Sequence, residues 1–134
     1  MPSATLDTST YISALQYGGE AFSLLEMGRD GEIDLAVSEE IIAETLGVLK
    51  RKFGWSDARL EGARATMEAT ARSVVPQQTL NVIIEDPPDN RILECAVEAG
   101  SEYIVSGDRD FLRRGSYEGI RMVKVADFLN IVTG

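Results

Sequence analysis

The chain has 134 residues, 44% hydrophobic and 26% charged, which is typical of one globular domain large enough to bury a full core. Histidine is absent, which excludes a Ser-His-Asp or Cys-His mechanism and histidine acid–base cleavage of RNA, and the single cysteine excludes an internal disulfide and a cysteine-rich zinc site. The net charge of −9 argues against broad binding of nucleic acid through a basic surface, although carboxylates that hold a metal count as negative in this sum.

The first half of the chain alternates short apolar strands with helices. Ser38 predicts a helix N-cap, Gly54 ends the helix that Ser38 opens, and Ser56 opens the next one. The elements expected here are a strand at 3–6, a helix at 10–27 broken near Gly18-Gly19, a strand at 33–37, and helices at 39–53 and 57–71.

The second half continues this alternation. Gly100 predicts the end of a helix that starts at Asp89, and Asp86-Pro87-Pro88 predicts the turn before it. Cys95, within this apolar helix, is expected to be buried and inert. The other elements expected are a strand at 74–75, an extended segment at 79–84, a strand at 103–105, a short helix at 108–114, a strand at 121–125 and a terminal helix through 132. Such alternation predicts a single α/β domain over residues 1–134, a three-layer α/β/α sandwich around a central, mostly parallel sheet.

Acidic residues recur where predicted strands end and helices begin. Asp7 follows the first strand, Asp89 starts a helix, and Asp108 and Asp110 follow the strand at 103–105. Glu44 lies at the edge of the apolar face of its helix. Because parallel strands end at one edge of a sheet, we expect these acids to converge there. Their mutual repulsion favours a hard divalent cation among them, and the usual catalytic partner of such a cation is a phosphate ester.

Each acid also has a structural explanation. Asp7 and Asp89 suit helix N-caps, and Glu44 suits a solvated helix edge. Asp108 and Asp110 flank one arginine, an arrangement that creates repulsion without structural benefit and so favours a functional role. Taken together, the acids favour metal-dependent chemistry.

Three segments resemble PIN-domain proteins, and most closely the PIN-family toxins of type II toxin–antitoxin systems: LDTSTYISAL, SEEIIAETLGVLKRKF and DPPDNRILECAVEAGSEYIVSGDRDFL. The resemblance implies a PIN-like fold and a ribonuclease that uses one or two Mg²⁺ or Mn²⁺ ions. It implies that Asp7, Glu44 and Asp89 are catalytic, metal-binding acids. The fourth acid lies in the segment GDRD, where Asp108 is preferred and Asp110 is the alternative.

The resemblance also implies residues that support these acids. Ser9 stands where family members often carry asparagine, and Ser38 and Ser106 match small hydroxyl positions near the site. The arginines that are candidates for contacting flanking phosphates are Arg91, Arg109, Arg113 and Arg114.

The resemblance implies an endoribonuclease that acts on single-stranded RNA. It also implies that the protein is the toxin of a toxin–antitoxin pair, with a small antitoxin as its partner, and that it forms a homodimer. Glu44 would orient or deprotonate the attacking water. No apolar run approaches the ~20 residues that span a bilayer, and no signal peptide precedes the first apolar stretch, so we expect a cytoplasmic protein without membrane contact.

Four alternatives remain open. The first is a PIN nuclease with a housekeeping role in RNA processing, which the sequence cannot distinguish from a toxin. A phosphoacceptor receiver domain needs an adjacent acidic pair after one strand and a lysine at the end of a later strand, whereas Lys124 is expected within the last strand. A haloacid-dehalogenase-like phosphatase needs a second aspartate where the chain has Ser9. The last is a catalytically silent PIN fold used for binding.

Overall fold

A six-stranded sheet forms the centre of the protein. The computed structural model describes residues 1–83 and 87–134. The strand order is β3-β2-β1-β4-β6-β5, and every neighbouring pair is parallel except β5 with β6. The strands are β1 (Ser3–Leu6), β2 (Asp34–Val37), β3 (Arg72–Ser73), β4 (Tyr103–Val105), β5 (Ser116–Tyr117) and β6 (Ile120–Val123). The carboxyl ends of β1, β2 and β4 therefore share one edge of the sheet, here called the carboxyl edge.

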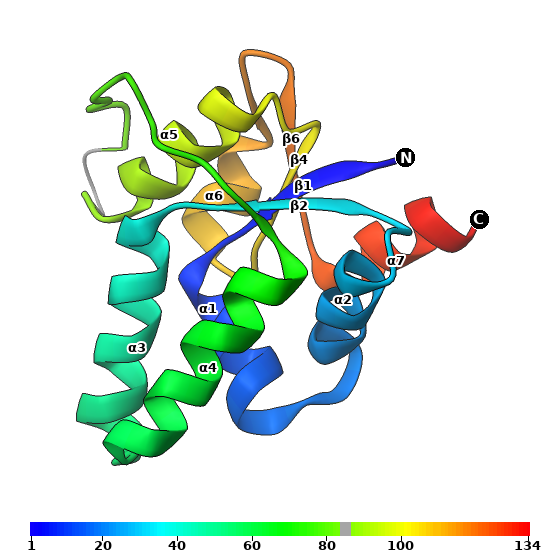
Figure 1. The fold of residues 1–134 in the computed structure, drawn as a ribbon. Helices are drawn as coiled ribbons and strands as arrows, with labels where there is room; N and C mark the ends of the chain where they lie inside the picture. The colour runs from blue at the N-terminus through cyan, green and yellow to red at the C-terminus, as the bar shows by residue number, and fades with distance from the viewer. Residues whose placement is uncertain (84–86) are drawn as a thin grey trace.

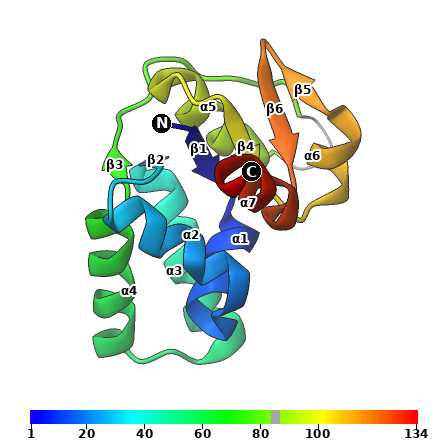
Figure 2. The same ribbon diagram turned by 90° about the vertical axis from the view of Figure 1, so that its right-hand side faces the viewer.

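Helices cover both faces of this sheet, which confirms the predicted three-layer α/β sandwich (Figures 1 and 2). Helix α5 packs on one face against β1, β2 and β4, and α2 and α7 lie on the other. On that second face, the ring of Tyr103 packs on that of Phe128, with centroids 5.4 Å apart. The helices are α1 (Thr8–Ile12), the π-helix η1 (Ser13–Tyr17), α2 (Gly19–Arg29), α3 (Glu39–Phe53), α4 (Asp57–Thr70), α5 (Asp89–Ala99), α6 (Arg109–Arg114) and α7 (Val125–Thr133).

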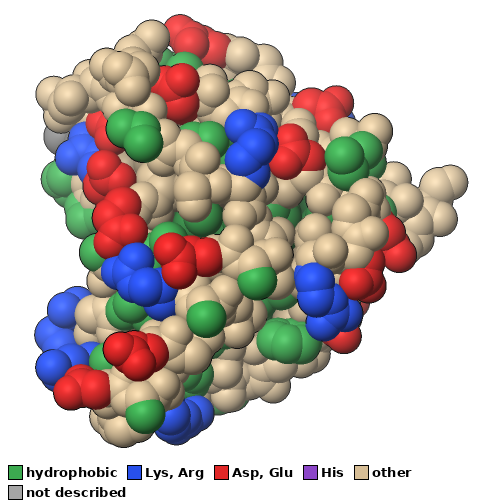
Figure 3. Space-filling view, viewed as in Figure 1, with side chains coloured by type: hydrophobic (Ala, Val, Ile, Leu, Met, Phe, Trp, Pro, Cys, Tyr) green, Lys and Arg blue, Asp and Glu red, His purple; other side chains and the backbone are tan. Residues whose placement is uncertain are grey.

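Helices α3 and α4 extend beyond the sheet as a pair with a small apolar core of its own (Figure 1). Leu49, Trp55 and Ala63 form this satellite core, and Trp55 Nε1 donates to Gln16 Oε1 at 2.8 Å. On the face that carries α3 and α4, acidic and basic side chains of the described residues are intermixed (Figure 3).

Local signals placed most helix ends correctly. Ser38 caps α3 by accepting from Ile41 N, Ser56 caps α4, and Gly54 ends α3 at a φ of 66°. The predicted break at Gly18-Gly19 is also confirmed, since both glycines have positive φ, a region that disfavours a side chain.

Two predicted strands have different bounds in the structure, and one strand was not predicted. The strand expected at 74–75 lies at Arg72–Ser73, and Val74 adds only a bond from its N–H to Val37 O. The last strand ends at Val123, so Lys124 follows it as the N-cap residue of α7. Strand β5 was not predicted. No strand forms at 79–83, and Ile84 and Asp86, which complete the predicted extended segment and turn, lie outside the described residues.

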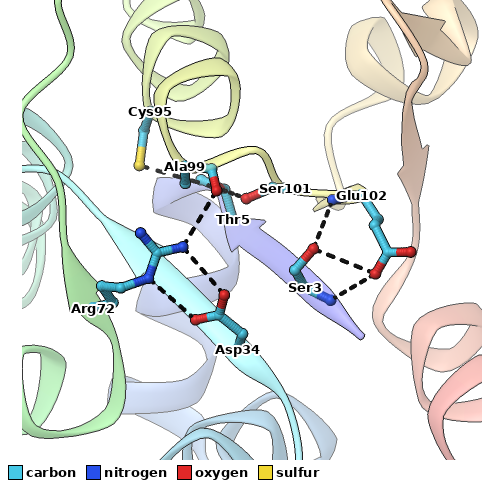
Figure 4. A network of polar contacts seen from close by, with 8 residues as sticks. All are labelled: Ser3, Thr5, Asp34, Arg72, Cys95, Ala99, Ser101 and Glu102. Carbon is cyan, nitrogen blue, oxygen red and sulfur yellow. Dashed lines mark hydrogen bonds and ion pairs between the residues drawn. The ribbon is translucent and has the colours of Figure 1, made fainter. Parts of the chain in front are cut away.

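A polar network fastens the amino edge of the sheet, opposite the carboxyl edge (Figure 4). The Arg72 guanidinium donates to Asp34 Oδ2 at 3.1 Å and to Ala99 O at 3.2 Å, which joins β2, β3 and the end of α5. Glu102 Oε1 accepts from Ser3 N at 3.0 Å. The acids at this edge thus have local structural partners. In the described part of the chain, no helix is long and apolar enough to cross a membrane.

Candidate functional site

Asp7 is buried at the carboxyl edge, directly after β1, with 3% of its surface exposed. Its Oδ1 accepts from Thr10 N at 2.8 Å, so Asp7 is indeed the N-cap of α1. Capping does not account for the rest of its bonding, however. Ser9 Oγ donates to both carboxylate oxygens at 2.9 and 3.0 Å, and Ser106 Oγ donates to Oδ2 at 2.5 Å. Two hydroxyls in addition to the cap therefore orient this carboxylate.

The environment of Asp7 is costly for a negative charge. Burial raises the pKa of Asp7 above its ordinary value of 3.8, and hydrogen bonds from Ser106, Thr10 and Ser9 oppose this effect without cancelling it. No Lys or Arg of the described residues forms an ion pair with Asp7. A bound cation would relieve the cost of charging Asp7.

Ser106 links Asp7 to Asp108. The register of β1 and β4 pairs Leu6 with Val105, which places the residues that follow these strands side by side. Ser106 Oγ donates to Asp7 and accepts from Asp108 N at 2.9 Å. One buried hydroxyl thus connects the Asp7 carboxylate with the backbone N–H of Asp108, and these two residues follow adjacent strands.

Asp108 and Asp110 occupy different surroundings. Asp108 caps α6, where its Oδ1 accepts from Asp110 N at 2.7 Å and from Phe111 N at 3.3 Å. Asp110 lies 3.4 Å from Arg113 Nη1 and helps to line a cavity of about 320 Å³ with Ile83, Arg113 and Arg114. Of the two, only Asp108 is connected to Asp7 by the hydrogen bonds described above.

Glu44 and Asp89 reach this edge on the helices α3 and α5. Both helices begin at the carboxyl edge and contact each other (Figure 1). Glu44 is half-buried in the second turn of α3, and Asp89 is half-buried as the first residue of α5. The prediction that Asp89 is an N-cap was wrong, because Pro88 occupies the cap position. Ser38 caps α3 through Ile41 N at 3.4 Å, and among the hydrogen bonds of the described residues none joins its hydroxyl to Asp7 or Asp108.

The donor atoms at this edge are carboxylate and hydroxyl oxygens, which suit a hard divalent cation such as Mg²⁺ or Mn²⁺. Thr8 Oγ1, next to Asp7, is buried and has no hydrogen-bond partner among the described residues. Across residues 1–83 and 87–134, no three acidic side chains come close enough together to hold a metal ion. The donor atoms are thus of the kind that a hard cation prefers, while the described residues form no ready-made cluster of three acids.

The four predicted arginines lie in three different surroundings. Arg91 is engaged, since its Nη2 lies 2.8 Å from Glu94 Oε2 and donates to Leu80 O at 3.0 Å. Arg113 and Arg114 line the cavity beside Asp110, and Arg109 is exposed at the start of α6.

Two further residues at this edge were not predicted from the sequence. Thr10 is buried and bonds Asp7 through its N–H and Val105 O through its hydroxyl. Asn90 is buried beside Asp89 and makes four hydrogen bonds. The signal in the sequence that could have identified Asn90 was its position directly after Asp89.

A protein-family model described as PIN domain matches residues 3–110. The chain belongs to the PIN-domain family. The matched range contains all five predicted acids, from Asp7 to Asp110. Comparison with curated protein sequences gave no significant match.

Solved structures share the fold of this PIN domain. One is a chain of VapBC2 from Rickettsia felis, crystallised with a DNA fragment from the promoter, with a TM-score of 0.62, 14% identity, and coverage of 90% of this chain and 96% of that chain. Another is VapC20 of Mycobacterium tuberculosis, described as a Sarcin-Ricin loop cleaving toxin, with a TM-score of 0.62, 16% identity, and coverage of 88% and 98%. At these identities the likeness establishes the fold, and it agrees with the predicted PIN-like sandwich.

Proposed function

We propose that this PIN domain is an endoribonuclease that hydrolyses phosphodiester bonds of single-stranded RNA with the help of Mg²⁺ or Mn²⁺. The observation that carries the proposal is the buried Asp7 carboxylate, which is oriented by Ser9 and by Ser106, a serine that also accepts from the backbone N–H of Asp108. A carboxylate placed in this way without a protein cation suits a site completed by a metal. The absence of histidine leaves carboxylates as the groups available for acid–base chemistry.

Asp7, Asp89 and Asp108 are the residues that would hold one or two ions, with Asp110 as the alternative to Asp108. A bound divalent cation supplies stabilisation of the charge that develops on the phosphate oxygens and lowers the pKa of nearby water. Ser9 and Ser106 keep the Asp7 carboxylate in one orientation, so that its position is set before substrate arrives. Glu44, which lies on α3, would orient the attacking water or accept a proton from it.

Arg113 and Arg114 are proposed to bind phosphates next to the scissile bond. Both line the cavity beside Asp110, and a guanidinium pairs with phosphate oxygens through two parallel hydrogen bonds. Arg109 is an additional candidate at the exposed start of α6. Arg91 is the weaker candidate, because Glu94 and Leu80 O already occupy its guanidinium.

In the cell, we propose that the protein is the cytoplasmic toxin of a type II toxin–antitoxin pair and acts as a homodimer. Support comes from the structural likeness to VapBC2 and to VapC20, which is described as a Sarcin-Ricin loop cleaving toxin. The partner would be a small antitoxin that presents arginine to the carboxylates of the site. A housekeeping PIN nuclease would lack such a partner, so neutralisation by the product of a neighbouring short reading frame separates these two roles.

The test is cleavage of an end-labelled, unstructured RNA by the purified protein with Mn²⁺, with EDTA, and with EDTA followed by excess Mn²⁺. Cleavage should stop with EDTA and return with Mn²⁺. Cleavage that survives chelation contradicts the metal dependence. Phosphate transfer from a small phosphodonor to Asp7, without RNA cleavage, would instead support a receiver-like activity.

A further inference from the structure

Residues 80–83, here called the strap, cross the start of α5 without joining the sheet. Side chains of α5 hold the backbone of the strap. Glu94 Oε2 accepts from Leu80 N at 2.7 Å, and Arg91 Nη2 donates to Leu80 O at 3.0 Å. Asn90 holds the other end of the strap, at Val82 and Ile83.

Asn90 uses its whole amide group in this arrangement, and only 2% of its surface is exposed. Its Oδ1 accepts from Val82 N at 2.9 Å and from Ile83 N at 2.8 Å. Its Nδ2 donates to Ile83 O at 2.8 Å and to Pro87 O at 3.0 Å. Two donors meet the oxygen and two acceptors meet the nitrogen, so this position requires an amide. An aspartate here would place an oxygen against two carbonyl oxygens.

The fourth of these bonds reaches the turn that precedes Asp89. Asn90 N also donates to Pro87 O at 3.0 Å, and Arg91 N donates to Pro88 O at 3.0 Å. The Asn90 side chain thus connects this turn to the strap. Asp89, the residue proposed as a metal ligand, lies between the turn and Asn90. The strap in turn forms one wall of the arginine-lined cavity, since Ile83 lines it and Arg114 Nη2 donates to Val82 O at 3.4 Å.

We propose that Asn90 is a positioning residue: by bonding the strap and Pro87 together, it holds the start of α5 so that Asp89 is presented to the metal. The inference rests on the proposed function, because it takes Asp89 as a ligand. Asn90 itself touches neither metal nor substrate, and it acts through the backbone on either side of Asp89.

The test compares Asn90→Asp with Glu94→Gln by direct Mn²⁺ binding, measured from the electron paramagnetic resonance signal of free Mn²⁺ without RNA. Asn90→Asp keeps both accepted bonds and loses both donated ones, whereas Glu94→Gln disturbs the Leu80 end of the strap and the ion pair with Arg91 but none of the bonds of Asn90. Mutation of a group that orients a metal ligand typically lowers metal affinity ~10–100-fold. Asn90→Asp should therefore weaken Mn²⁺ binding by that factor, and Glu94→Gln should weaken it by less than ~3-fold. The added negative charge alone would strengthen cation binding, which makes the expected direction informative.

A second measurement on the unchanged protein covers the case in which Asn90→Asp does not fold. Because coupling between two sites is reciprocal, saturating Mn²⁺ should slow amide hydrogen exchange at Val82 and Ile83, whose N–H groups bond Asn90. Equal Mn²⁺ affinity in Asn90→Asp and the unchanged protein, unchanged exchange at these amides, or no Mn²⁺ binding by the unchanged protein would each overturn the inference. If Asn90→Asp weakens Mn²⁺ binding as expected but the unchanged protein cleaves no RNA, the proposed function is refuted while the inference about Asn90 stands.

Discussion

Replacing Ser106 with alanine should destabilise the protein far more than a single surface hydroxyl normally would. Ser106 is fully buried, donates to the Asp7 carboxylate and accepts from Asp108 N. A hydrogen bond to a charged group contributes about 1.5–3 kcal/mol and a neutral one about 1 kcal/mol, so Ser106→Ala should cost about 2.5–4 kcal/mol. That loss is a large part of the ~5–15 kcal/mol by which domains are stable. It should also raise the pKa of Asp7 further, since Ser106 is the main hydrogen-bond donor that lowers it.

Ser9→Ala is the matched control, because Ser9 also donates to the Asp7 carboxylate but is exposed. Water can replace the Ser9 hydroxyl, so this variant should lose less than about 1 kcal/mol. Denaturant unfolding at neutral pH measures both changes, and Trp55, the only tryptophan, is 8% exposed and reports unfolding by fluorescence. Far-ultraviolet circular dichroism should give the same transition if unfolding is two-state. A loss in Ser106→Ala no greater than that in Ser9→Ala would refute the reasoning about the buried bridge.

Three further predictions test other parts of the structure. Because the pKa of Asp7 is raised in the folded state, the stability of the protein falls as pH rises from 3.8 through the folded-state pKa. Thermal unfolding should therefore show that Asp7→Asn is more stable than the unchanged protein at neutral pH and equally stable below pH 3.8. The same variant should lose RNA cleavage. Gly28→Ala should lower the melting temperature, because the new Cβ would lie 2.4 Å from Thr70 O, whereas Gly62→Ala, with open space around it in α4, should raise stability by about 0.5–1 kcal/mol. Cys95, fully buried and with its pKa raised to about 11 by burial, should resist thiol-labelling reagents until denaturant is added; fast labelling of the native protein would contradict its placement.

Helix ends could be predicted from the sequence because their signals are local. Ser38, Ser56, Gly54 and Gly100 act through bonds or φ angles within a few residues of themselves, so no knowledge of the tertiary fold is needed. Strand limits depend instead on partners elsewhere in the chain. Arg72 belongs to β3 because it pairs across to Ala36 and its guanidinium reaches Asp34, and neither contact is visible in the local pattern.

The missed strand β5 shows a different limit. The two-residue turn between β5 and β6 has positive φ at both Glu118 (49°) and Gly119 (83°). Asparagine or aspartate before glycine is the common signal for such a hairpin, and glutamate in that position obscured it.

The sequence pattern singles out candidate acids, whereas it does not show which polar groups they contact. Asp7, Asp89, Asp108 and Asp110 stand near a predicted strand end or helix start, whereas Glu44 lies within a predicted helix, at the edge of its apolar face. The bridge from Asp7 through Ser106 to Asp108 depends on the register of β1 and β4, and Asn90 acquires its role from a strap that lies outside the sheet. Long-range pairing therefore decides which of the polar residues act together.

The most direct test of a metal-dependent nuclease site at the carboxyl edge is the rate of Mn²⁺-dependent RNA cleavage by Asp89→Asn, compared with Glu98→Gln. Both variants neutralise one acid on α5, but Glu98 is exposed and bonds Gln77 N, away from the start of the helix. The proposed function predicts that Asp89→Asn reduces cleavage to the level seen with EDTA, while Glu98→Gln retains the rate of the unchanged protein. Full cleavage by Asp89→Asn, or equal losses in the two variants, would contradict it.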